Sequence, residues 1–175
     1  MTSEVELPPE ITSPPVVLNE NPLYPVGGIF KFNASVGNEL RIRVQIRDED
    51  TAETLKARWR VKSGTKPYTM FDCTENSENT ISGTGLLVRE FDLFIERLKL
   101  ERGACNKVEF VVSPEFLSCK QQLFDVTVPE GNLGRATYWI WEMSGEPPTP
   151  TESQILVNTC ETIDMTNVQP TMESQ

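Results

Sequence analysis

The 175-residue sequence lacks several features on which whole classes of function depend. It contains no histidine, which excludes histidine-activated nucleophiles, histidine-ligated zinc and histidine proton switches. Its four cysteines form no C-x-x-C pair, so zinc ribbons and thioredoxin-type redox sites are poorly supported. No apolar run reaches the length of about 18 residues expected of a membrane-spanning helix. The opening residues Met-Thr-Ser-Glu-Val do not resemble a signal peptide.

Basic residues are missing from both ends of the chain. Nine of the 26 acidic residues and none of the 16 basic residues lie in residues 1–25 and 144–175. The net charge of −10 therefore belongs to the ends, and the middle is almost neutral. A nucleic-acid-binding surface needs clustered basic residues, so we expect no nucleic-acid partner.

Composition divides the chain into three parts. Residues 1–26 are acidic, contain six of the 13 prolines and show no periodicity. They predict an extended linker that touches a strand edge at Ile11 or at residues 16–18. Residues 144–175 predict an irregular acidic tail, partly pinned to the body, in which residues 155–157 are the one short run able to pair. The folded domain is expected over residues 27–143, which is long enough for a real core.

Alternation of apolar and polar residues dominates the middle part. Residues 40–47 alternate without a fault, and residues 55–62 repeat the pattern around Trp59, as is typical of strands with one buried face. The same reasoning predicts strands at residues 86–97, 107–113, 124–128 and 136–143. Helical spacing also partly fits residues 90–100, so a helix is the alternative there. Several short strands separated by turns predict an all-β, antiparallel sandwich.

Two segments, ELRIRVQIRDEDTAETLKARWRV and LERGACNKVEFVVS, resemble the immunoglobulin-like modules of bacterial surface proteins, of the polycystic-kidney-disease and cadherin-like type. In those modules, a strand that ends in acidic residues precedes a strand with a central Trp. The resemblance covers about residues 27–143, and the W-D-F-G-D-G segment common in that family is absent. It implies an immunoglobulin-like β-sandwich in an extracytoplasmic setting and implies no enzymatic activity.

Residues 1–26 are similar to the acidic, proline-rich lead-in that follows the lipidated cysteine of mature bacterial lipoproteins, although that cysteine is absent here. The similarity implies a protein of the periplasm, outer membrane or cell surface. Its signal peptide and lipid anchor would then lie outside the given sequence.

Charge provides an independent check of the immunoglobulin-like arrangement, which would place residues 40–47 beside 86–97 and residues 55–62 beside 107–113. The first pairing would set bases against acids, namely Arg41, Arg43 and Arg47 against Glu90, Asp92 and Glu96. The second would bring Arg58 and Arg60 near Glu109. Opposite charges across a ladder stabilise the pairing and help to set register, whereas a simple hairpin of the first two strands would place bases against bases.

Four cysteines, an even number, predict two disulfides in an oxidising compartment. Four reduced thiols acting as small apolar residues are the alternative. Of the three connectivities, we expect Cys105 with Cys119, which closes a local loop, and Cys73 with Cys160, which pins the tail to the body.

The densest acidic cluster of the body is Asp48, Glu49 and Asp50, with Glu53 nearby. Acidic loops between strands can supply the six to eight oxygens that calcium needs, which makes this cluster a weak calcium candidate. No second acidic loop accompanies it, so a solvated turn is the preferred interpretation. We expect neither a metal nor a cofactor.

Tyr138, Trp139 and Trp141 are candidate binding residues, because aromatic rings offer flat apolar faces to sugars. Alternation places Tyr138 on one face of the strand and the two tryptophans on the other, so one face is expected to pack into the core. A W-x-W strand is also similar to that of copper-dependent polysaccharide monooxygenases, whose two histidine ligands are absent here.

These observations predict a non-enzymatic interaction or structural module of a cell envelope. We expect it to bind another envelope protein through its edge strands or through the aromatic strand. The alternative is a carbohydrate-binding module that uses the same aromatic residues on a polysaccharide. A hydrolase without histidine would need two carboxylates about 5 to 10 Å apart in a cleft, and the sequence singles out no such pair.

Overall fold

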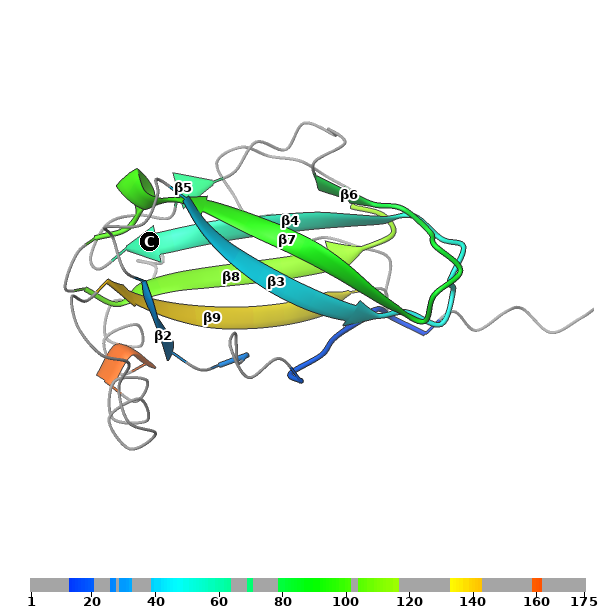
Figure 1. The fold of residues 1–175 in the computed structure, drawn as a ribbon, viewed down its shortest axis with the longest axis horizontal. Coiled ribbons are helices and arrows are strands. Elements are labelled where there is room, and N and C mark those ends of the chain that lie inside the picture. The colour runs from blue at the N-terminus through cyan, green and yellow to red at the C-terminus, as the bar shows by residue number, and fades with distance from the viewer. Residues whose placement is uncertain are drawn as a thin grey trace, which may run out of the picture.

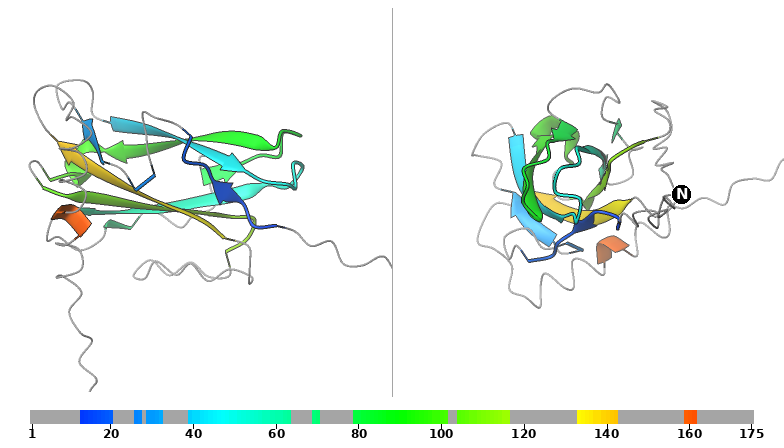
Figure 2. Two further views of the ribbon diagram at one scale, coloured as in Figure 1. Left: turned by 90° about the horizontal axis from the view of Figure 1, so that it is seen from below. Right: turned by 90° about the vertical axis from the view of Figure 1, so that its right-hand side faces the viewer.

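The computed structural model describes residues 13–20, 26–27, 29–32, 39–63, 69–70, 79–101, 104–116, 133–142 and 159–161. They form an all-β sandwich of two sheets, which lie face to face in Figure 1 and are seen from the side and from one end in Figure 2. The predicted fold class is confirmed.

One sheet has three strands in the order β1-β3-β7, from Val16–Val17, Glu39–Arg47 and Val88–Glu96. The other has the order β2-β9-β8-β4-β5. Its strands are Ile29–Phe32, Gly134–Glu142, Asn106–Ser113, Leu55–Ser63 and Thr69–Met70, and β6 (Thr80–Ile81) also pairs with β4. All pairs are antiparallel except β2, which runs parallel to β9.

The chain crosses from one sheet to the other between β3 and β4 and again between β7 and β8. As a result β3 pairs with β7, and β4 pairs with β8, which is the neighbourhood predicted from the charge pattern. The alternation in the sequence appears directly as alternating burial along β3 and β4. The helical alternative for residues 90–100 is wrong as far as Glu96, where β7 ends, and only a short 3-10 helix, η2 (Arg97–Lys99), follows it.

Other boundaries follow local chemistry. Strand β8 ends at Ser113, directly before Pro114, because proline has no N–H to offer the ladder. Val16–Val17 pairs with the edge of β3, and the Leu18 N–H donates to the Gln45 carbonyl at 2.8 Å, so the predicted contact at residues 16–18 is confirmed. Strand β2 was not predicted from the sequence. The predictions for Ile11, residues 124–128 and residues 155–157 lie outside the described residues.

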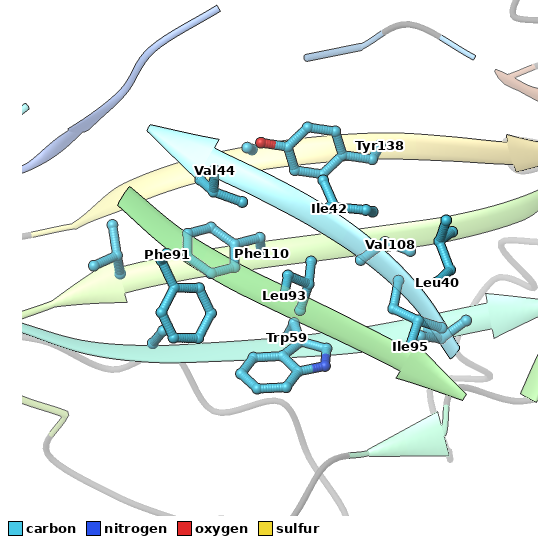
Figure 3. Packing of buried hydrophobic residues seen from close by; sticks show 14 of the residues in the cluster. Leu40, Ile42, Val44, Trp59, Phe91, Leu93, Ile95, Val108, Phe110 and Tyr138 are labelled. Atoms are coloured by element: carbon cyan, nitrogen blue, oxygen red, sulfur yellow. The ribbon is translucent and has the colours of Figure 1, made fainter. Parts of the chain in front are cut away.

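The core lies between the sheets, where Figure 3 shows side chains from β3 and β7 meeting those from β4, β8 and β9. Ile42, Leu93 and Phe110 are fully buried, and each such side chain contributes roughly 1.5–3 kcal/mol relative to exposure. The Phe91 ring lies between two other rings, with centroids 5.8 Å from Trp59 and 5.7 Å from Phe110. The predicted central Trp is therefore a core residue of β4.

Candidate interaction surface

Two of the three predicted binding residues on the aromatic strand β9, Tyr138 and Trp139, are not exposed to solvent. Tyr138 points into the core and is 1% exposed, and burial raises the pKa of its hydroxyl well above the ordinary value. Trp139 points to the opposite face of the sheet and is 4% exposed. Trp141 is half-buried and packs beside it. Alternation along the strand was predicted correctly, but both faces of β9 are covered at Tyr138 and Trp139.

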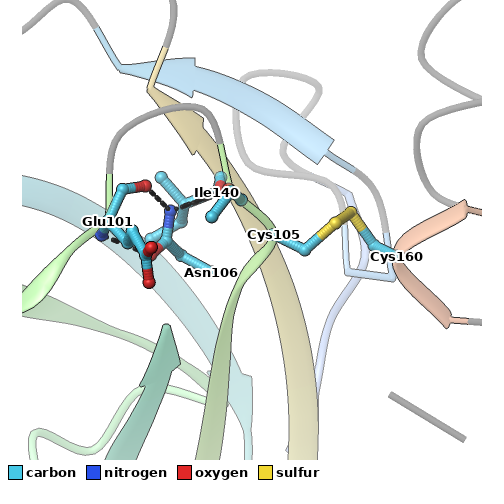
Figure 4. Close-up of a disulfide and its surroundings, with 6 residues drawn as sticks. Glu101, Cys105, Asn106, Ile140 and Cys160 are labelled. Atoms are coloured by element: carbon cyan, nitrogen blue, oxygen red, sulfur yellow. Dashed lines mark hydrogen bonds between the residues drawn. A yellow bond between two sulfur atoms is a disulfide. The ribbon is translucent and has the colours of Figure 1, made fainter. Parts of the chain in front are cut away.

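A disulfide between Cys105 and Cys160 covers the outer face of β9 (Figure 4). Cys160 lies in a helical turn at residues 159–161 and packs with Cys105 against Trp139. The Lys107 ammonium lies 5.7 Å from the Trp139 ring centroid. The chain's own C-terminal turn therefore occupies the surface on which the sequence had placed a ligand.

The predicted connectivity is wrong. Cys105 is bonded to Cys160, 55 residues away, and not to Cys119, so Cys160 is not bonded to Cys73. Loop length favoured a local bridge, but the sheet places Cys105, just before β8, on the same outer face as the C-terminal turn. Cys160 is joined to the body through Cys105 and not, as predicted, through Cys73. Cys73 and Cys119 lie outside the described residues.

The acidic cluster after β3 is organised around a buried arginine. The Asp48 carboxylate accepts a hydrogen bond from the Arg89 guanidinium, with 1% and 2% of the two side chains exposed. Burial raises the pKa of Asp48, and the Arg89 charge opposes part of that rise. The described residues contain no group of three or more side chains that could hold a metal ion.

The turn itself is held by hydrogen bonds between side chains and backbone groups. The Asp50 carboxylate accepts from the N–H groups of Ala52 and Glu53 at 3.2 and 3.1 Å, and the Arg89 guanidinium donates to the Glu53 carbonyl at 2.6 Å. Burial raises the pKa of Glu53, and the charges of Asp48 and Asp50 add to the rise. The acidic residues thus form a braced turn at one end of the sandwich, as preferred from the sequence, but Asp48 is buried in it and not solvated as expected.

Several of the charge pairs predicted across the ladders form, but Arg47 lies opposite Val88, and Glu96 lies opposite Glu39 and binds Lys99 instead. The Asp92 carboxylate of β7 binds Arg41 and Arg43 of β3, and the hydrogen bond from Arg41 is the main reason why the pKa of Asp92 is lowered. Glu90 lies 3.5 Å from Arg43. In the second sheet, Glu109 binds Arg60. These contacts fix the register of the strands that frame the sandwich.

Exposed apolar side chains concentrate on β7 and the residues on either side of it. Of the six large hydrophobic residues that are exposed in the described parts of the chain, five lie here: Leu86, Leu87, Val88, Phe94 and Leu98. Leu98, in the 3-10 helix after β7, is 96% exposed, and Phe94 is 48% exposed. Within the described residues, β7 is the end strand of its sheet. Monomeric proteins seldom leave such a set in contact with water unless it meets a partner.

An open groove of about 540 Å³ runs beside the first half of β7. Residues of β7 form one wall, and Thr80, Ile81 and Ser82, in and after β6, form the other. Phe91 and Ile81 line it with apolar surface, while Leu86 and Val88 stand at its exposed rim. Apart from the apolar run at residues 86–88, nothing in the sequence indicates this groove, because it is made by strands from different sheets.

Comparisons with protein-family models, with curated proteins and with solved structures find no match for this chain. Among the described residues, no helix is both long enough and apolar enough to cross a membrane.

Proposed function

We propose that this protein is a non-enzymatic interaction module of a cell envelope and that it binds another envelope protein. The observation that carries the proposal is the set of exposed apolar side chains along β7, an end strand of the described sandwich. Exposed apolar surface stabilises a complex when it is removed from water, at about 25 cal/mol per Å² before the costs of association.

The strand order supports an immunoglobulin-like assignment. Strands β3 and β7 correspond to strands B and E of that fold, while β4, β8 and β9 correspond to C, F and G. The crossings from β3 to β4 and from β7 to β8 give the Greek-key connection found in most β-sandwiches. Such sandwiches serve many unrelated functions, so the assignment supports an architecture, and the partner is argued from the surface.

The Cys105–Cys160 disulfide supports an extracytoplasmic location, because disulfides persist in oxidising compartments and are rare in the cytosol. In this proposal the acidic, proline-rich residues that precede β1 act as a spacer that holds the module away from a lipid anchor at the membrane surface. Alkylation of free thiols in intact cells, followed by mass spectrometry, tests the location. Cys105 and Cys160 should resist the reagent until a reductant is added. Alkylation of either cysteine without reductant would contradict the extracytoplasmic location.

The proposed protein partner is tested by capture from envelope extracts with the full chain as bait. We expect Phe94→Ser and Leu98→Ser to reduce capture of a specific protein. Val16→Ser is the matched control, because Val16 is also exposed and apolar but lies on β1, at the other end of the same sheet. Equal capture by all three variants, or no specific capture at all, would contradict the proposal. The carbohydrate alternative has less support, because Tyr138 and Trp139 are buried.

A further inference from the structure

We propose that the edge of β7 beside which no described strand lies, here called its free edge, binds an extended segment of the partner protein as an added antiparallel or parallel β-strand, whose outward side chains are basic at some positions. This inference rests on the proposed function and names the mode and chemistry of its binding surface.

The backbone groups of alternate β7 residues point away from β3. The Asp48 N–H donates to the Leu87 carbonyl at 2.9 Å, which continues the β3–β7 register beyond Arg47 and Val88. In an antiparallel ladder, the backbone N–H and C=O groups of alternate residues bond to one neighbouring strand, and those of the residues between them point to the opposite edge of the strand. The N–H and C=O groups that face the free edge are therefore those of Val88, Glu90, Asp92, Phe94 and Glu96. Such a row is a template for pairing with another chain.

The groove gives room for the added strand where these groups begin. It lies between β7 and residues 80–82, so a segment hydrogen-bonded to Val88 and Glu90 enters it. Successive side chains of that segment point to opposite faces. Its inward side chains meet the apolar surface of Ile81 and Phe91, which are 6% and 7% exposed. These positions favour apolar residues.

The outward side chains of the added strand would lie beside those of the β7 residues that face the free edge. Val88 and Phe94 offer apolar contacts there. The side chains of Glu90 and Glu96 are 52% and 57% exposed, although each has a cation nearby. Opposite charges on directly paired residues stabilise a ladder, and like charges destabilise it. A partner strand with Lys or Arg at these outward positions is therefore favoured.

The same charges disfavour a second copy of this chain as the occupant. In every antiparallel β7–β7 register that overlaps three or more edge-facing residues, an acid stands opposite an acid; Asp92 faces Asp92 in the symmetric register, for example. The net charge of −10 adds repulsion between copies. The edge is thus protected against pairing with itself while it remains open to a basic segment.

Glu90→Pro tests the backbone part of the proposal. Proline removes the N–H that faces the free edge and leaves intact the ladder with β3, which uses the neighbouring residues. Glu90→Thr is the matched control, because it removes the same charge but keeps the N–H and suits a strand. We expect Glu90→Pro to weaken partner capture at least about tenfold and Glu90→Thr to weaken it far less. Thermal unfolding and the intact disulfide check that both variants fold.

A peptide titration tests the partner chemistry without the natural partner and does not depend on whether Glu90→Pro folds. The probe is a capped peptide as long as β7 that alternates Val and Lys, and the comparison peptide alternates Val and Glu. We expect the Lys peptide to bind the wild-type chain at least about tenfold more tightly. Its binding should slow hydrogen exchange of the edge-facing amides, such as Glu90 and Phe94. N-methylation of its amides on the face that meets β7 should abolish the effect, and N-methylation on the other face should not.

The outcomes separate this inference from the proposed function. Strand addition would be overturned if Phe94→Ser abolishes capture, Glu90→Pro leaves capture unchanged and the peptide does not slow hydrogen exchange of the edge-facing amides. The proposed protein–protein function would still stand in that case. Equal binding of the Lys peptide and the Glu peptide would overturn the inference that the partner segment is basic. If the chain sediments as a dimer and Glu90→Pro dissociates that dimer, a second copy of the chain occupies the edge. That result would also overturn the proposal of a basic partner segment. Peptide binding without any natural capture would support the edge and contradict the proposed envelope partner.

Discussion

The guanidinium of Arg89 points from β7 into the end of the sandwich and donates to the carboxylate of Asp48, at the end of β3. Both side chains are almost completely buried. The same guanidinium donates to the Glu53 carbonyl at 2.6 Å, so the pair ties β7 to the turn between β3 and β4. Close backbone packing completes the arrangement: a Cβ at Gly83 would lie 2.1 Å from the Ala52 carbonyl oxygen. This end of the molecule also carries the groove beside β7.

We expect Asp48→Asn to lower the free energy of unfolding by roughly 3–5 kcal/mol, because it leaves the buried Arg89 charge without a counter-ion. Urea unfolding monitored by circular dichroism measures the loss. The double variant Asp48→Asn, Arg89→Met is the control, since it removes the charge as well and should recover part of the stability. If the double variant is as unstable as the sum of the single variants, the pair is not coupled as described.

Glu109 should contribute to the pH dependence of stability. Burial alone would raise its pKa, but hydrogen bonds from Arg60 and Lys107 outweigh burial and hold it below the ordinary value of 4.5. A group whose pKa is lower in the folded state stabilises the fold above its unfolded pKa, and that contribution is lost as the pH falls through the folded value. We expect Glu109→Gln to be less stable than wild type at neutral pH.

The difference in unfolding free energy between wild type and Glu109→Gln should shrink as the pH falls below about 4.5. Asp48 and Glu53 have raised pKa values and act in the opposite direction, but both are present in the two proteins, so their effects cancel in the comparison. Denaturant titrations at a series of pH values measure the difference. A difference that stays constant with pH would show that the Glu109 pKa is not lowered.

Removal of the disulfide by Cys160→Ser should release the cover over Trp139. We expect the tryptophan emission to shift to longer wavelength and the unfolding free energy to fall by about 4 kcal/mol, as for closure of a loop of this length. Trp139→Phe in the same background is the control and should remove the shift. Peptide mapping under non-reducing conditions should recover Cys105 joined to Cys160; recovery of Cys105 joined to Cys119 would contradict the observed pairing.

Asn106 should be needed for the loop that precedes β8. Its buried side-chain amide donates to the carbonyls of Glu101, Ala104 and Ile140 at 3.0 to 3.1 Å and accepts from the Glu101 N–H at 2.8 Å (Figure 4). Loss of a buried partner costs roughly 1–3 kcal/mol, so Asn106→Ala should lower stability by at least that amount. Asn106→Asp is the matched variant, because it keeps the acceptor and loses the donor. Faster hydrogen exchange at the Glu101 N–H in Asn106→Ala but not in Asn106→Asp would identify the lost contact.

The alternation of apolar and polar residues predicted strands correctly where one face of the strand is exposed to solvent. The alternation around Ile42 and Trp59 predicted both strands and their buried faces, and the charges of Arg43 and Asp92 predicted which strands are neighbours. Strand β2 was missed because four residues are too few to show a period, and its place beside β9 depends on a parallel pairing more than a hundred residues away.

The candidate site was predicted less well than the fold. Trp139 looked like a binding residue because aromatic content is visible in the sequence, whereas the disulfide that covers it joins two distant cysteines. Arg89 interrupts the apolar face of β7, and this irregularity was the one available sign of the buried pair with Asp48. The exposed β7 edge could not be predicted, because exposure of a strand depends on which strands lie beside it.

The sequence by itself determined the long strands of the sandwich, the faces that they bury and the charge pairing of β3 with β7. Those features depend on residues close in the chain, or on complementary charges along two strands, and both can be read from spacing and residue type. The tertiary structure alone decided the disulfide, the burial of the aromatic strand and the open groove beside β7. Each of these depends on bringing together segments that no local rule connects, so the surface available to a partner was settled only when the two sheets packed.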